Sequence, residues 1–188
     1  MNDNQLKNSN VNGGRINDNN IFSVVKNTNL SVLSVKNSLY NADSYSDEFN
    51  LLKTADDFRI FHLMSVKKYN FNDSIYGLVH VQLKYFKKMS NYDYYMNIVK
   101  KKTEQAVEIS KKHSGVDKVF VLLDLYNITQ RNFSKKFIKI FANDMNDRYD
   151  NQLAVCYITG NLSFVKVMWP FILMFLEKET KEKLMLLK

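Results

Sequence analysis

The second half of the chain contains two short, continuous apolar runs with an amphipathic segment between them. The runs are KVFVLLDL at 118–125 and QLAVCYIT at 152–159, and uninterrupted apolar runs of this length are typical of strands covered on both faces. Between them, FSKKFIKIFANDM at 133–145 would place Phe and Ile side chains on one side of a helix and lysines on the other. Strand, helix and strand in this order predict a parallel crossover unit with a right-handed connection.

Upstream of these runs, apolar residues recur at spacings of three and four, which predicts helices. A first helix is expected to begin at Thr54, where Asp57 completes a capping box. A second helix is expected from about 73 to 89. A third is expected from about 93 to 112, with Gly115 as its stop signal.

The pattern divides the chain into three parts. Residues 1–50 are rich in Asn, Ser and Asp, and their short apolar islands lack a long helical period, so we predict a flexible tail. A helical N-terminal part is expected over 51–115 and an α/β part over 116–188. The predicted fold class is α/β, in which the helical part precedes a mostly parallel sheet with flanking helices.

A further apolar segment, from Phe164 to Leu176, follows the second predicted strand. It contains about 13 residues and would extend roughly 20 Å as a helix, whereas the apolar core of a bilayer is about 30 Å thick. It also contains Lys166, so we expect the helix to pack against protein, with adsorption to a membrane surface as the alternative. Ser163 is the expected N-cap, and Pro170 is expected to bend or restart the helix.

Composition and charge narrow the class of protein. Of 188 residues, 45% are apolar, which supports a core, and the net charge of +8 favours anionic partners such as nucleic acid, acidic lipid headgroups or phosphates. A genome biased toward Lys would give the same charge. The basic residues are spread along the chain and form no known nucleic-acid-binding motif, so nucleic acid is not favoured. The single cysteine, Cys156, excludes an intrachain disulfide and indicates a reducing, cytoplasmic setting.

Candidate catalytic and metal-binding residues do not converge in the sequence. Asp124 ends the first predicted strand, where open α/β sheets bind ligands, and could be a nucleophile or metal ligand; a carboxylate that secures the following turn is the favoured alternative. The three histidines are scattered, without Cys or acidic residues at ligand spacing. Cys156 lies mid-strand with no evident base. We therefore predict that the protein is not an enzyme and has no metal and no cofactor.

Two stretches, taken in order, resemble the CRAL-TRIO family of lipid-binding domains. The first is ADDFRIFHLMSVKKYNFNDSIYGLVHVQLKYFKK at 55–88, which is similar to the family's N-terminal segment. The second comprises VFVLLDLYNIT and then YDNQLAVCYITGNLSFVKVMWPFILMFLEKETKEKL at 149–184. The positions that match the family there are Tyr149, Leu153, Lys166, Trp169, Phe175 and Leu176.

The chain departs from the family pattern in several places, among them the turn at Gly160-Asn161-Leu162 and Met174, where the family has Pro. Asn151 stands where phosphoinositide-binding members have Glu. Between Lys88 and the third predicted helix, the family has an early strand pair, for which this chain leaves only a few residues. The family also continues past the position of Lys188 with a helix that gates its lipid cavity. We therefore expect a divergent relative without the strand pair and the C-terminal gate.

The resemblance implies non-catalytic binding or transfer of a phospholipid such as phosphatidylinositol, or of another hydrophobic molecule. It also implies a cytoplasmic protein in transient, peripheral contact with anionic membranes. The residues it assigns to lipid binding are Lys183, as a headgroup contact, with Trp169, Phe175, Phe164 and Tyr149. The alternative is a truncated scaffold that recognises protein partners without lipid cargo, or forms a homodimer, through an uncovered apolar groove.

Overall fold

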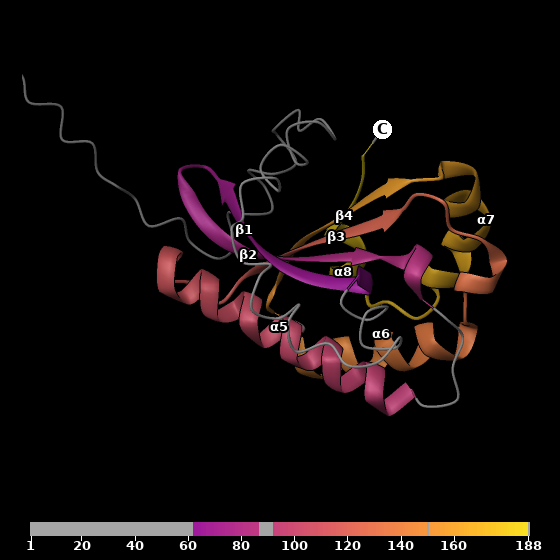
Figure 1. Ribbon diagram of the computed structural model, residues 1–188, viewed down its shortest axis with the longest axis horizontal. Coiled ribbons are helices and arrows are strands. Elements are labelled where there is room, and N and C mark those ends of the chain that lie inside the picture. The colour runs from indigo at the N-terminus through magenta and orange to yellow at the C-terminus, as the bar shows by residue number, and fades with distance from the viewer. Residues whose placement is uncertain (1–61, 87–91, 150, 188) are drawn as a thin grey trace, which may run out of the picture.

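A computed structural model of the chain describes residues 62–86, 92–149 and 151–187. The tail predicted over 1–50 and the capping box at Thr54 lie outside these residues. Within them the chain forms a five-stranded, mostly parallel sheet with flanking helices (Figure 1). The predicted α/β fold class is therefore confirmed.

The strands lie in the sheet in the order in which they occur in the chain. They are β1 (Met64–Phe71), β2 (Ser74–Gln82), β3 (Val119–Leu125), β4 (Leu153–Gly160) and β5 (Leu184–Leu186). β1 and β2 are antiparallel, and every later pair of neighbours is parallel. β3 and β4 are the strands predicted from the two continuous apolar runs, and α6 (Lys135–Tyr149) connects them as expected.

Residues 64–82 form a β-hairpin and not the helices that their spacing predicts. β1 and β2 are joined at Asn72 and Asp73, whose φ angles are 47° and 60°. Positive φ at both central residues is what a tight two-residue hairpin turn requires, and Asn and Asp tolerate it. Four consecutive residues of β2 are buried, so its apolar run lacks the alternation of a half-buried strand. The early strand pair that we expected to be absent is therefore present, as β1 and β2.

The long helix α5 (Tyr92–Ser114) lies against β1 and β2 and confirms the third predicted helix. Gly77 of β2 allows this contact, because a Cβ there would lie 2.0 Å from the carbonyl oxygen of Ala106. The Gly77 N–H donates to the hydroxyl of Ser110 at 2.8 Å. The helix ends before Gly115, whose φ of 74° is the left-handed conformation of the predicted stop signal.

The last two helices connect β4 to β5. α7 (Leu162–Leu173) begins directly after β4, and α8 (Lys178–Glu182) leads into β5. The side-chain oxygen of Asn161 accepts the N–H of Phe164 at 3.1 Å. Asn161 is therefore the N-cap of α7, and the prediction of Ser163 is wrong by two positions.

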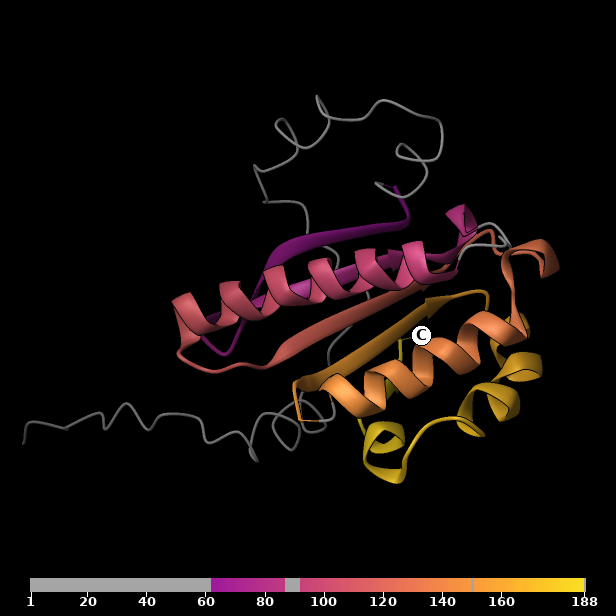
Figure 2. The ribbon, with the colours of Figure 1, turned by 90° about the horizontal axis from the view of Figure 1, so that it is seen from below.

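One topological rule determines the side of the sheet on which the connecting helices lie. Parallel neighbours joined in sequence order by right-handed crossovers carry their connecting helices on the same side of the sheet. Figures 1 and 2 show α5 and α6 on one side of the strands and α7 beyond the ends of β3 and β4. Pro170 lies inside α7 without ending it. No helix in the described residues is both long enough and apolar enough to cross a bilayer.

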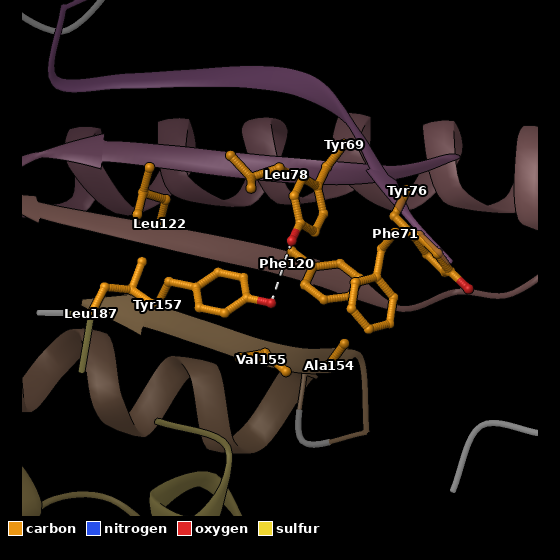
Figure 3. Packing of buried hydrophobic residues seen from close by; sticks show 10 residues of the cluster. All are labelled: Tyr69, Phe71, Tyr76, Leu78, Phe120, Leu122, Ala154, Val155, Tyr157 and Leu187. Atoms are coloured by element: carbon orange, nitrogen blue, oxygen red, sulfur yellow. Dashed lines mark hydrogen bonds between the residues drawn. The ribbon is translucent and has the colours of Figure 1, made fainter. Parts of the chain in front are cut away.

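The side of the sheet opposite α5 carries a cluster that we call the aromatic face (Figure 3). Its members are Tyr69, Phe71, Tyr76, Leu78, Phe120, Leu122, Ala154, Val155, Tyr157 and Leu187. Leu78 belongs to this face, whereas Val79, the next residue of the strand, packs with α5. Tyr69 and Tyr157 share a hydrogen bond of 3.4 Å between their hydroxyls, and burial raises the pKa of both phenols.

Candidate functional site

Apolar side chains from the carboxyl-terminal halves of β3 and β4 meet side chains of α7 on the helical side of the sheet. The buried members are Leu125, Ile128 and Ile158. The half-buried members around them are Leu83, Leu123, Cys156, Phe164, Trp169 and Leu184. We call these residues the Trp169 cluster. The strands β3, β4 and β5 supply its floor, and α7 supplies its two aromatic rings.

This cluster is packed less completely than the aromatic face behind it. Leu123 and Cys156 lie in interior strands and point toward the helices, yet both are only half-buried. Leu122 and Tyr157, their neighbours on the aromatic face, are 2% and 0% exposed. The described side chains therefore leave apolar surface only partly covered beside Trp169.

Of the residues that the resemblance assigns to lipid binding, the structure brings Phe164 and Trp169 together. The Phe164 ring also lies edge-on to Phe133, with 6.3 Å between the ring centroids. Phe175 is half-buried in the turn that follows α7. Tyr149 is the last residue of α6, and its side chain lies outside the described structure.

Lys183 lies directly before β5 and is paired with a carboxylate. Its Nζ is 2.8 Å from Oε1 of Glu179, one helical turn earlier, and its side chain is 12% exposed. The hydrogen bond and positive charge of Lys183 hold the pKa of the Glu179 carboxyl below its usual range. The Lys183 carbonyl accepts the N–H of Cys156 at 2.9 Å, which fixes the residue to β4 at the margin of the Trp169 cluster. An anionic group that contacted Lys183 would compete with Glu179.

Asp124 has the turn-securing role that was favoured over catalysis. Its Oδ1 accepts the N–H of Tyr126 at 2.9 Å, just after β3. Its Oδ2 lies 3.7 Å from Nε2 of His80. Alternation along the strands places both residues on the side of the aromatic face, away from the Trp169 cluster. In the described parts of the chain, no three or more His, Cys, Asp or Glu are grouped to hold a metal ion.

Cys156 contributes a thiol to the Trp169 cluster without contributing a nucleophile. Burial raises the pKa of the Cys156 thiol to about 12. Because the thiolate is the reactive form, the protonated thiol behaves at neutral pH as a small apolar side chain. A surface of this composition suits a hydrophobic ligand rather than acid–base chemistry.

Sequence reasoning missed the sheet residues of this surface, among them Leu123, Ile158 and Leu184. The positions of these residues in their strands gave one signal that could have identified them. Side chains at alternate positions of a strand share a face, and ligands of open α/β sheets bind at the carboxyl ends of the strands. β3 and β4 are apolar on both faces, so their sequences do not indicate which face lies toward α7.

Comparison with known proteins gives two matches of different kinds. The family model described as the CRAL/TRIO domain matches residues 61–188. Among solved structures, the crystal structure of Sfh5 is similar, with a TM-score of 0.59 at 12% sequence identity. The similarity covers 72% of this chain and 49% of that one, so this chain spans about half the length of that structure. At this identity the likeness concerns the fold alone. No curated protein matches this chain.

Proposed function

Because the chain belongs to the CRAL/TRIO domain family, we propose that it binds a phospholipid or another hydrophobic molecule against the Trp169 cluster and exchanges this ligand at membranes. Proteins of the family are generally lipid binders or lipid transporters rather than enzymes. The family supports lipid binding in general. The surface and the class of ligand proposed here rest on the side chains of this chain.

The observation that carries the proposal is the half-buried state of Leu123 and Cys156 in the middle of the sheet. Interior parallel strands with helices over them ordinarily bury such side chains. An acyl chain laid against them would remove apolar surface from water, a gain of roughly 0.8 kcal/mol for each methylene fully covered. For a 16-carbon chain the upper limit is about 13 kcal/mol, of which a partly open surface would retain a fraction.

Lys183 supports a phosphate-bearing headgroup at the margin of the cluster. A phosphate there would accept a charge-assisted hydrogen bond from the ammonium group, in competition with the carboxylate of Glu179. Phosphatidylinositol and phosphatidylcholine both carry this phosphate. We propose phosphatidylinositol as the first ligand to test, and phosphatidylcholine as the second.

Exchange of such a ligand requires contact with a membrane. The net charge of +8 favours an anionic leaflet, such as the cytoplasmic one. The single cysteine is compatible with a reducing compartment. We therefore propose a cytoplasmic protein that contacts anionic membranes transiently, and we do not propose catalysis.

The test uses the full-length protein purified without detergent. Organic extraction followed by mass spectrometry should recover a stoichiometric lipid, and the protein should take up labelled phosphatidylinositol or phosphatidylcholine from vesicles. Trp169→Ala should weaken binding by about tenfold or more, because it removes one of the two rings that α7 contributes to the cluster. Tyr94→Ala removes an exposed ring on α5, outside the cluster, and should leave binding unchanged.

Absence of stoichiometric lipid, together with no uptake of either labelled lipid, would contradict the proposal. Equal affinities of the wild-type protein and Trp169→Ala would show that the ligand binds elsewhere. A lipid-free protein that self-associates in sizing chromatography would instead support the protein-recognition alternative.

A further inference from the structure

We propose that the outward side of α7, together with the start of α6, is the surface through which the protein contacts an anionic bilayer. The inference rests on the proposed function, because it assigns the membrane contact that exchange of a lipid requires. The side chains concerned point to solvent, whereas Phe164 and Trp169 of the same helix pack in the Trp169 cluster.

The apolar part of this surface consists of Val167, Pro170 and Met174. Val167 is 77% exposed and Met174 is 65% exposed, the highest values among the large apolar side chains of the described residues. Pro170 is exposed as well. Spacings of three and four residues place all three on one side of α7. The helix that begins the crossover from β4 to β5 thus presents an apolar stripe to solvent.

Two segments that flank or contain this stripe are cationic and lack carboxylates, which resume after the stripe at Glu177. Residues 126–143 and 153–176 contain five Lys and Arg residues and no Asp or Glu. The five are Arg131, Lys135, Lys136, Lys139 and Lys166, all exposed. Both views show α7 and the start of α6 at the end of the sheet where β3 and β4 finish (Figures 1 and 2). The ring contact between Phe133 and Phe164 joins the two segments.

An anionic bilayer is the partner that matches both properties. In interfacial membrane contacts, apolar tips enter the headgroup region while cations remain at the anionic surface. Nucleic acid would use the cations but would gain nothing from Val167 and Met174, since its phosphate backbone is charged. A protein partner that buried the apolar stripe would also have to cover five cations with matching carboxylates.

Cosedimentation of the full-length protein with vesicles tests the apolar part. Phosphatidylcholine vesicles that contain about 30% phosphatidylserine should bind the protein, and pure phosphatidylcholine vesicles should bind it far more weakly. Val167→Asp should weaken binding to the anionic vesicles by about tenfold or more, because it carries a carboxylate into the interface. The matched control is His113→Asp, which introduces a carboxylate at an exposed residue in the last turn of α5 and should bind as the wild-type protein does.

A second pair of variants tests the cationic part and leaves Val167, Pro170 and Met174 in place. Lys135→Gln combined with Lys136→Gln should weaken binding to the anionic vesicles by about thirtyfold, the effect of two cations near such a surface. Lys111→Gln combined with Lys112→Gln makes the same change at the far end of α5 and should have little effect.

Uptake of a short-chain fluorescent phospholipid in the absence of vesicles separates this inference from the proposed function. Val167→Asp should retain that uptake while it loses vesicle binding. If Val167→Asp and His113→Asp bind vesicles equally, or if the wild-type protein does not prefer anionic vesicles, the inference is wrong even where lipid uptake is intact. Circular dichroism identifies any variant that fails to fold, and the lysine variants then decide the question.

Discussion

Cys156 shows how a position in the sheet sets the chemistry of a side chain. The thiol lies in the middle of β4, within the Trp169 cluster, and burial raises its pKa to about 12. Folding therefore favours the neutral thiol. Burial of the neutral thiol therefore contributes to stability fully below the ordinary thiol pKa of about 8.5. This contribution is lost as the pH rises from there toward 12, because the thiol of the unfolded chain ionises first.

Alkylation of Cys156 by iodoacetamide at pH 8 should be on the order of a thousandfold slower in the folded protein than in urea, because only the thiolate reacts. Mass spectrometry of samples taken over time would measure both rates. The folded rate should rise about tenfold per pH unit as far as pH 10, while the unfolded rate levels off above pH 9. Comparable rates at pH 8 would show that folding does not raise the pKa of the Cys156 thiol.

The contact between α5 and β2 depends on a residue without a side chain. Gly77→Ala should lower the free energy of unfolding by about 3 kcal/mol, because the added methyl group would meet the backbone of Ala106. Gly115→Ala is the matched control: nothing lies within 4 Å of its added Cβ, so only the left-handed conformation costs energy, about 1 kcal/mol. Urea denaturation would compare the two variants. Equal losses would mean that helix and strand are not in this close contact.

Elements whose pattern of apolar residues fits only one type of secondary structure were predictable from the sequence. β3 and β4 are apolar runs too short for a helix, and α5 and α6 alternate apolar and polar sides over several turns. β2 was misassigned because α5 covers one of its faces and the aromatic face occupies the other, which removes the two-residue period. The pair Asn72–Asp73 was the signal for the hairpin, since these residue types accept positive φ.

The candidate site was predictable only in its helical part. Phe164 and Trp169 were assigned from a family resemblance, and the structure places them in one cluster. Their partners Leu123 and Ile158 are ordinary strand residues, and nothing in their local sequence distinguishes them from Leu122 and Tyr157 on the other face. The distinction arises from which distant segments pack on each face of the sheet, and the local sequence of a strand does not contain that information.

The molecule as a whole places two different environments on the two sides of one sheet. The aromatic face is buried almost completely, while the Trp169 cluster on the helical side is half-buried. The Trp169 cluster combines residues of β3, β4, β5 and α7, so a ligand bound there would contact the sheet and a crossover helix together. We therefore expect ligand binding and global stability to be coupled through the helical side.

Saturation with a bound phospholipid at about 100 times its Kd should raise the free energy of unfolding by about 2.7 kcal/mol and the Tm by several degrees. Trp169→Ala should reduce this shift at the same ligand concentration. Tyr157→Phe on the aromatic face removes a partner of the Tyr69 hydroxyl and should lower the starting stability, yet retain the full shift. Calorimetry would measure all three. A shift abolished by Tyr157→Phe alone would place the ligand on the aromatic face.

β1 forms one border of the sheet, and no other strand in the described part of the chain pairs with its outer side. Such a border can template the addition of the same strand from another molecule. Its sequence places Lys67 and Lys68 side by side at the middle of the strand, so an antiparallel pairing of two molecules about this point would set like charges opposite one another. We therefore expect the two lysines to oppose edge-to-edge association of two molecules, and this opposition should weaken as added salt screens the charges.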